Sequence, residues 1–174
     1  MTRTQEISGR FLYEEMQHFP RWFRIVLAML MGSSLLITVV SVLATSTGEN
    51  KTELKEAVLS ILLVILINGI TYFLIVKMKL EKQVTSNGIY YRWLPYQKKY
   101  RYMERSELAS FYIRKSPAMS YGAKWHPGYG KTHNLSNGKG LQFHLTNGKK
   151  IFFGSSDIEG FTQAVQKMMG KNHS

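Results

Sequence analysis

The chain contains no cysteine, which excludes disulfide bonds, zinc–thiolate sites and a cysteine nucleophile. Acidic side chains are scarce as well, because 11 Asp and Glu stand against 23 Lys and Arg, for a formal net charge of +12. Only five of the acids follow residue 76, so this part is poorly supplied with paired carboxylates for acid–base catalysis. We therefore expect a protein that is not an enzyme and that carries no cofactor.

Charged side chains are absent altogether from two long stretches. Residues 57–76 (AVLSILLVILINGITYFLIV) would span about 30 Å as a helix, which is the thickness of the hydrocarbon core of a bilayer. Residues 25–44 form a second such run, and its small residues Gly32, Ser33 and Ser34 suit close packing against the first. A polar connection, residues 45–56, joins the two. The sequence predicts a transmembrane helical hairpin over residues 25–76.

Residues 1–24 precede the hairpin and are expected to bring the chain to the membrane. We expect residues 1–9 to be a disordered tail and residues 10–23 (RFLYEEMQHFPRWF) to lie as a helix in the membrane interface. Its apolar face would hold Phe11, Leu12, Met16 and Phe19. An ordinary flanking turn is the alternative. The sequence VLA at residues 42–44 resembles a peptidase site, but the three preceding glutamates favour a retained span.

Basic residues flank one side of the predicted hairpin. Before it stand Arg3, Arg10, Arg21 and Arg24, and after it Lys77, Lys79 and Lys82. The connection between the spans holds only Lys51 and Lys55. By the positive-inside rule, we expect a multi-pass protein of the bacterial cytoplasmic (inner) membrane with both termini in the cytoplasm.

Beyond residue 76 the apolar pattern changes from continuous to alternating, which is typical of strands. The predicted strands are residues 78–85, 89–94, 98–103, 108–115, 140–146 and 149–154. Asn87-Gly88 and Asn147-Gly148 predict tight hairpin turns, because Asn-Gly tolerates the positive φ that primed turns need.

A final amphipathic helix is predicted over residues 157–169. Ser156 and Glu159 match the capping box that opens many helices. The apolar positions at helical spacing are Ile158, Phe161, Val165 and Met168. Such a face must cover something, most simply the open end of a curved sheet. The divisions we expect are a tail and interfacial segment (1–24), the hairpin (25–76) and a basic domain (77–174).

The segment 116–139 is a long stretch rich in Gly, Tyr and Asn, and we expect a loop with room for one further strand. Loops of this length in compact domains are often functional. As candidate partner contacts it offers Tyr121, Lys124, Trp125, His126, Tyr129, Lys131, His133 and Asn134. The histidines in the interior of the domain, His126, His133 and His144, lack nearby acids in the sequence, so no metal site is expected.

Residues 77–174 carry 17 basic and five acidic side chains, so they hold nearly the whole positive surplus. Their most distinctive run, residues 90–102 (YYRWLPYQKKYRY), mixes aromatic rings with cations, a mixture that suits anionic headgroups. The candidate membrane-surface contacts are Lys77, Lys79, Lys82, Arg92, Lys98, Lys99 and Arg101. A half-buried sheet with a solvated basic face is the alternative. Nucleic acid is the least favoured partner.

The order of these elements resembles small bacterial two-span membrane proteins with a cytoplasmic PH-like domain, whose members are mostly of unknown function. The matching stretches are residues 13–17 (YEEMQ), 88–95 (GIYYRWLP), 121–122, Trp125, 134–136, 140–142 and 145–150 (LTNGKK). Ala123 and Lys124 depart from the more glycine-rich pattern. The resemblance implies an α+β membrane protein whose hairpin is followed by a PH-like antiparallel β-barrel or bent sheet capped by the helix.

The function expected from these observations is a membrane-anchored, non-enzymatic binding or scaffold module. It would face the cytoplasm and contact anionic lipid, a protein partner or both. The alternative is an accessory subunit or enzyme that uses residues 116–139 as a ligand pocket. Phosphoinositide-binding PH domains use a long basic loop between their first two strands, whereas Ser86-Asn87-Gly88 is short and uncharged, so the resemblance carries no headgroup specificity.

Overall fold

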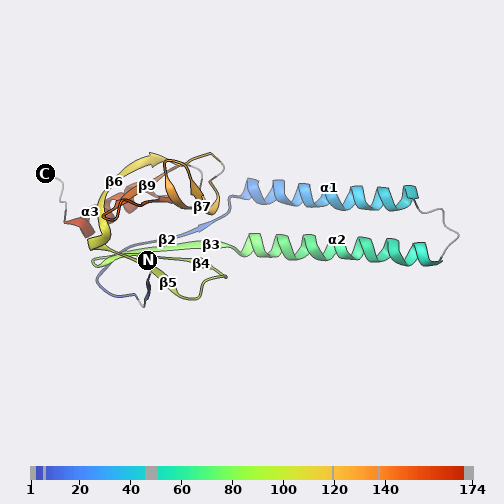
Figure 1. Ribbon diagram of the computed structural model, residues 1–174, viewed down its shortest axis with the longest axis horizontal. Helices are drawn as coiled ribbons and strands as arrows, with labels where there is room; N and C mark the ends of the chain where they lie inside the picture. Colours follow the sequence, from blue (N-terminus) through green and yellow to red (C-terminus); the bar gives the residue numbers. More distant parts are fainter. Residues whose placement is uncertain (1–2, 6, 46–50, 119, 137, 171–174) are drawn as a thin grey trace. The chain divides into compact units, whose positions relative to one another are not determined.

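The computed structural model describes residues 3–5, 7–45, 51–118, 120–136 and 138–170. They form two units (Figure 1). One unit is Pro20–Lys77, and the other joins Met1–Phe19 to Met78–Ser174. The residues before the helical hairpin and those after it therefore fold together, and the hairpin is an insertion within the sequence of the second unit.

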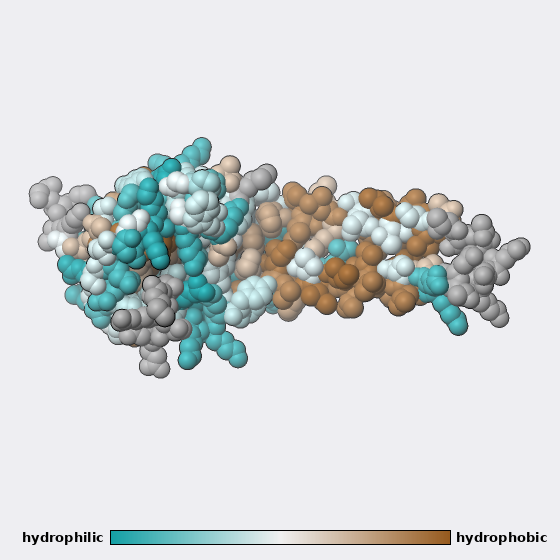
Figure 2. All heavy atoms as spheres, in the orientation of Figure 1, coloured by the Kyte–Doolittle hydropathy of each residue, from teal (hydrophilic) through white to brown (hydrophobic). Residues whose placement is uncertain are grey.

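The helical unit consists of α1 (Arg21–Thr45) and α2 (Lys51–Lys77), both long and apolar enough to cross a membrane. Large apolar side chains are exposed along both helices, and on the face shown in Figure 2 they are brown. The Asn68 side-chain amide donates to Ser34 Oγ over 3.0 Å and joins the helices. Gly32 does not serve the close packing expected of it, because a Cβ there would meet nothing within 4 Å.

Two strands occupy the segment in which we expected a disordered tail and an interfacial helix. These are β1 (Arg3–Gln5) and β2 (Phe11–His18), and both predictions for residues 1–24 are therefore wrong for the described residues. The strand period was concealed because β2 turns Glu15 and Gln17, which are polar, toward the protein interior. An inward face of that kind lacks the apolar alternation by which strands are recognised.

The first sheet has the strand order β1-β5-β4-β3-β2 and is antiparallel throughout. Its later strands are β3 (Lys79–Thr85), β4 (Gly88–Leu94) and β5 (Tyr100–Glu104). The predicted turn at residues 86–88 is present, but Gly88 belongs to β4 and not to the turn. Glycine is needed there because a Cβ would lie 2.3 Å from the carbonyl oxygen of Met103.

The second sheet has the order β6-β9-β10-β8-β7, and β8 runs parallel to β10. Its strands are β6 (Leu108–Lys115), β7 (Gly122–His126), β8 (Gly130–Asn134), β9 (Lys139–Leu145) and β10 (Lys150–Gly154). The segment 116–139 therefore holds a hairpin of two strands, where we expected a loop with one. Gly148 adopts a φ of 78°, as the predicted Asn-Gly turn between β9 and β10 requires.

The two sheets pack against each other and do not close into the barrel or single bent sheet that we expected. The short 3-10 helix η1 (Arg105–Glu107) links them. Helix α3 (Ile158–Met169) packs on β2, β3 and β9, and its Phe161 is fully buried. Asp157 caps this helix by accepting from Gly160 N over 2.9 Å, so the prediction of Ser156 as the cap is wrong.

The insertion of the hairpin leads to a prediction about fragments. Residues 78–174 alone lack β2, so they should fail to unfold cooperatively. A chain in which a short Gly-Ser linker replaces residues 20–77 should fold, because His18 and Lys79 are paired neighbours in the sheet. Denaturant unfolding followed by tryptophan fluorescence measures both. A cooperative transition of the 78–174 fragment at the same midpoint would contradict the role assigned to β2.

Candidate functional site

A buried ion pair between the two sheets is the most constrained polar feature of the β-rich unit. Lys82 of β3 is fully buried, and its Nζ lies 2.9 Å from Glu15 Oε2 on β2. The same ammonium donates to the Gly154 carbonyl over 2.5 Å and lies 4.3 Å from the ring centre of Phe161. Lys82 is therefore not a membrane-surface contact, which corrects one of our candidates.

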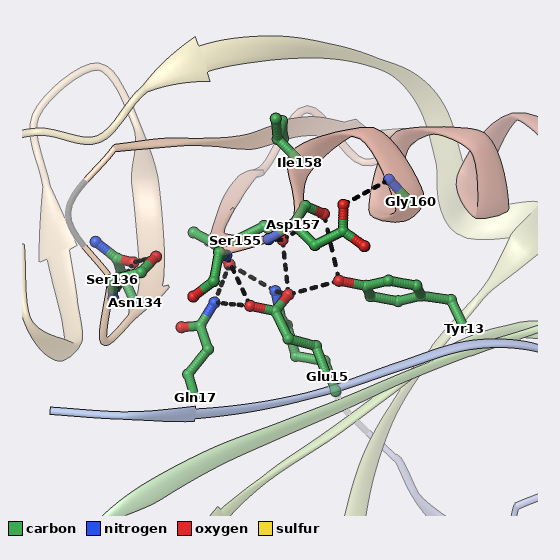
Figure 3. A network of polar contacts seen from close by, with 12 residues as sticks. Tyr13, Glu15, Gln17, Asn134, Ser136, Ser155, Asp157, Ile158 and Gly160 are labelled. Carbon is green, nitrogen blue, oxygen red and sulfur yellow. Dashed lines mark hydrogen bonds and ion pairs between the residues drawn. The ribbon is translucent and has the colours of Figure 1, made fainter. Parts of the chain in front are cut away.

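Glu15 uses both of its oxygens fully (Figure 3). Besides Lys82, its donors are the Tyr13 hydroxyl (2.9 Å), the Gln17 amide (2.8 Å), the Ser155 hydroxyl (2.6 Å) and the Ser156 backbone N–H (2.7 Å). Burial acts to raise the pKa of Glu15, but the charge of Lys82 and the hydrogen bonds from Ser155, Ser156 and Gln17 outweigh it and lower the pKa to about 2. The carboxylate thus stays ionised.

Gln17 extends this network across the sheets. Its side-chain amide also donates to the Gly154 carbonyl over 2.8 Å, and its carbonyl oxygen accepts from Leu135 N over 3.0 Å. We call Glu15, Gln17 and Lys82 the polar clamp, because they join β2 and β3 to the end of β10 and to the chain after β8. A buried carboxylate whose oxygens are already occupied has no free position for a substrate, so the clamp is structural.

The clamp predicts unequal effects of its two charges. In Glu15→Ala, Lys82 loses its counter-ion and keeps the Gly154 carbonyl and the Phe161 ring, so we expect a loss of about 3–5 kcal/mol of unfolding free energy. Lys82→Met should cost less, because Glu15 retains four hydrogen-bond donors. Denaturant unfolding of the variants measures this. The double variant should be more stable than Glu15→Ala alone; additive losses would refute the clamp.

A second ion pair lies on the other side of the first sheet. Arg92 Nε lies 2.7 Å from Glu81 Oε2, and the guanidinium carbon lies 4.2 Å from the ring centre of Tyr100. The Tyr100 hydroxyl donates to the same carboxylate. Arg92 is half-buried and its charge is compensated, so it is a poor candidate for attracting a membrane surface.

The remaining candidate cations of the β-rich unit lie at distinct places on the first sheet. His18 pairs with Lys79, and Lys79 with Leu94, so these residues share one end of the sheet. The exposed Lys98 and Lys99 follow β4 at that same end. Arg101 pairs with Tyr91 in the middle of the sheet instead. Lys77 belongs to α2, where its Nζ lies 5.6 Å from the ring centre of Phe73.

The candidate partner residues lie on and around the β7–β8 hairpin, but they do not form one surface. Trp125 and Lys131 are exposed and directly paired, so the structure brings these two together. Tyr121 contacts Phe19, with ring centres 6.1 Å apart. Asn134 is buried and donates to Ser120 Oγ over 2.9 Å, so it is not offered to a partner.

The turn of this hairpin is fastened to β6 of the same sheet. The Arg114 guanidinium carbon lies 3.5 Å from the ring centre of Tyr129, and the Tyr129 hydroxyl donates to the Lys115 carbonyl. His126 Nδ1 lies 3.0 Å from the carbonyl oxygen of Pro127 beside it. The backbone carbonyl of Lys124 accepts from the Thr132 hydroxyl across the strands. These contacts make the hairpin a fixed element.

His133 is buried in an aromatic environment between the sheets. Trp93 Nε1 donates to its Nδ1 over 3.0 Å, so a neutral ring carries its proton on Nε2. The ring stacks on Phe153, with centres 5.2 Å apart. Burial, with the charges of Lys131 and Arg101, lowers the pKa of His133 to about 3. Within the described part of the chain, no group of three His, Cys, Asp or Glu could hold a metal ion.

His133 and Glu15 predict a loss of stability in acid. Both folded pKa values, about 3 and about 2, lie below the usual 6.5 and 4.5, so the unfolded chain takes up protons first as pH falls. The His133 contribution is complete above pH 6.5 and declines toward pH 3. By pH 5 it removes about 2 kcal/mol of unfolding free energy.

Unfolding midpoints at pH 7 and pH 5 test this. The difference should shrink in His133→Gln, whose side chain can still accept the Trp93 hydrogen bond, whereas His126→Gln provides the matched loss of an imidazole outside the core. An undiminished difference in His133→Gln would contradict the assignment.

A cleft of about 470 Å³ opens between the sheets beside the strands β4 and β5. Its apolar wall comprises Tyr91, Met103, Leu145 and Ile151. Lys131, Lys149 and Lys150 line it as cations, with Glu107 as one carboxylate and Trp125 as a largely exposed ring. Sequence reasoning found Lys131 and Trp125 but missed the rest, because the cleft is assembled from four segments that lie far apart in the sequence. The basic pair of the LTNGKK turn was their only local signal.

No family model, curated protein or solved structure matches this chain.

Proposed function

We propose that the chain is a membrane-anchored, non-enzymatic binding module of the bacterial inner membrane, whose β-rich unit contacts the anionic cytoplasmic leaflet. The observation that carries the proposal is the position of Lys79, Lys98 and Lys99. These cations lie at the end of the first sheet from which the chain leaves for α1 and to which it returns from α2. Cations close to the ends of two membrane spans are held where a leaflet's surface potential acts.

The strand pairing supports placing both termini on one side of the membrane. β1 and β2 precede the hairpin, and they pair with β5 and β3, which follow it. Two spans return the chain to its starting side, so both halves of the β-rich unit can meet there. The basic residues that flank the spans support the cytoplasm as that side.

The distribution of charge supports a surface role over a catalytic one. The buried carboxylates Glu15 and Glu81 are each held by a cation and by hydrogen bonds. Asp157 caps α3, and Glu107 accepts from the backbone N–H of Glu104. The carboxylates with assigned contacts are thus engaged in structure, while most cations after residue 82 are exposed. The resemblance to PH-like membrane proteins supports the proposal through the shared order of a hairpin, a sheet domain and a closing helix.

A fluorophore in the turn between β4 and β5 tests the lipid contact. The chain has no cysteine, so Tyr96→Cys accepts a single label next to Lys98, and Ser106→Cys places the control label on η1. In nanodiscs, nitroxide lipids should quench the label at position 96 more strongly when phosphatidylglycerol is present. Each cation near an anionic leaflet contributes about 1 kcal/mol, and salt should weaken the effect because screening sets in within about 10 Å.

Charge variants complete this experiment. Lys98→Gln with Lys99→Gln should reduce the quenching, whereas Lys139→Gln with Lys167→Gln removes equal charge elsewhere and should leave it unchanged. Equal quenching with neutral and anionic lipid would refute the proposal.

A further inference from the structure

The cleft beside β4 and β5 combines properties that the polar clamp lacks. Its wall is apolar, whereas its cations Lys131 and Lys149 are exposed and take part in none of the ion pairs among the described residues. Arg101 lies near Lys131, and partial burial together with this guanidinium lowers the pKa of Lys131. Like charges lie close together here, and Glu107 is the one acid among the described residues that line the cleft.

The arrangement of side chains follows from strand alternation. On β8, Lys131 and His133 project from the same face, because residues two apart share a face of the sheet. His133 meets Tyr91, with ring centres 4.7 Å apart, and Tyr91 forms part of the cleft wall. The cleft therefore continues the aromatic core outward and ends in a basic rim. A volume of about 470 Å³ falls within the range of roughly 300–1,000 Å³ typical of small-molecule sites.

We propose that this cleft binds a single-chain anionic amphiphile of the fatty-acid type, with its tail on the apolar wall and its carboxylate at Lys131 and Lys149. The complementarity of charge and surface carries the assignment. A free inorganic anion would leave the half-buried Leu145 and Ile151 and the exposed ring of Trp125 uncovered, and a neutral apolar ligand would leave the cations unused. Trp125, 72% exposed, is placed to cover the bound chain. This inference rests on the proposed binding role, but not on the contact of Lys98 and Lys99 with lipid.

Quenching of tryptophan by bromine provides the test, because it requires contact. The full chain is placed in phosphatidylcholine nanodiscs and titrated with 8-bromooctanoate, with empty nanodiscs used to correct for partition. Quenching should be saturable and should be largely lost in Trp125→Phe. The probes that lack one half of the chemistry, 8-bromooctan-1-ol and 4-bromobutanoate, should bind at least tenfold more weakly.

Charge variants separate this site from the proposed membrane surface. Lys131→Gln with Lys149→Gln should weaken 8-bromooctanoate binding at least tenfold, and both residues are exposed, so folding should be unaffected. Lys98→Gln with Lys99→Gln is the matched control and should change binding less than twofold. Loss of binding in that control alone would overturn the cleft assignment, whereas failure of the leaflet experiment would leave it standing.

Two further arms address other occupants. Saturable quenching of Trp125 by ATP, with none by 8-bromooctanoate, would mean that the cleft takes a nucleotide and would overturn the proposal. Quenching by brominated two-chain phosphatidylglycerol in the nanodisc, with none by 8-bromooctanoate, would mean that the cleft takes a bilayer lipid and would likewise overturn the proposal. Non-saturable quenching identical to that of empty nanodiscs would remove the site.

Discussion

The ion pair between Glu15 and Lys82 is the interaction on which the rest of the β-rich unit depends. Both residues belong to the first sheet, but they also bond to Gly154, the last residue of β10, and to Ser155 and Ser156, which lead from the second sheet to α3. A buried ammonium or carboxylate is stable only when its partners are in place. The pair therefore favours one arrangement of the two sheets over the many that apolar packing alone would permit.

The same pair ties together segments far apart in the sequence. Glu15 precedes the helical hairpin and Lys82 follows it, yet β2 and β3 are paired from Tyr13 opposite Val84 to His18 opposite Lys79. The cost of closing a connection grows only slowly with its length, so a long insertion between paired strands is tolerated. Where paired strands already hold the two ends of an insertion together, the insertion adds little further loss of chain entropy. The sheet therefore determines the spacing of the two points at which the chain enters and leaves the hairpin.

The elements that the sequence predicted best are those that a local pattern marks, such as a long apolar run, an alternating stretch or a turn dipeptide. The two long helices, β6 and the turn at Asn147-Gly148 follow directly from hydropathy, alternation and turn chemistry. β2 could not be found this way, because its inward face is a glutamate and a glutamine whose partners lie about 140 residues away. Lys82 was wrongly predicted to face the surface for the same reason. A lysine in an alternating strand is expected to face solvent unless its buried partner, here Glu15, is known. The cleft, drawn from four segments, depends on tertiary contacts that no local pattern encodes.

The clamp and the cleft lie at different strands of the same sheet, and this asymmetry has a physical basis. β2 and β3 meet the second sheet through charged and amide groups, whose directional bonds hold the backbones close. β4 meets it through rings, as Tyr91 contacts Phe153 and His133. Beyond those rings, Met103 of β5 reaches the cleft. A closed barrel would have continued the hydrogen-bonded ladder across this gap. The two sheets are held together by the clamp at β2 and β3, and among the described residues no hydrogen-bonded ladder joins them at β4 and β5. A cleft with an apolar wall and a basic rim therefore stays open at that side of an otherwise packed domain.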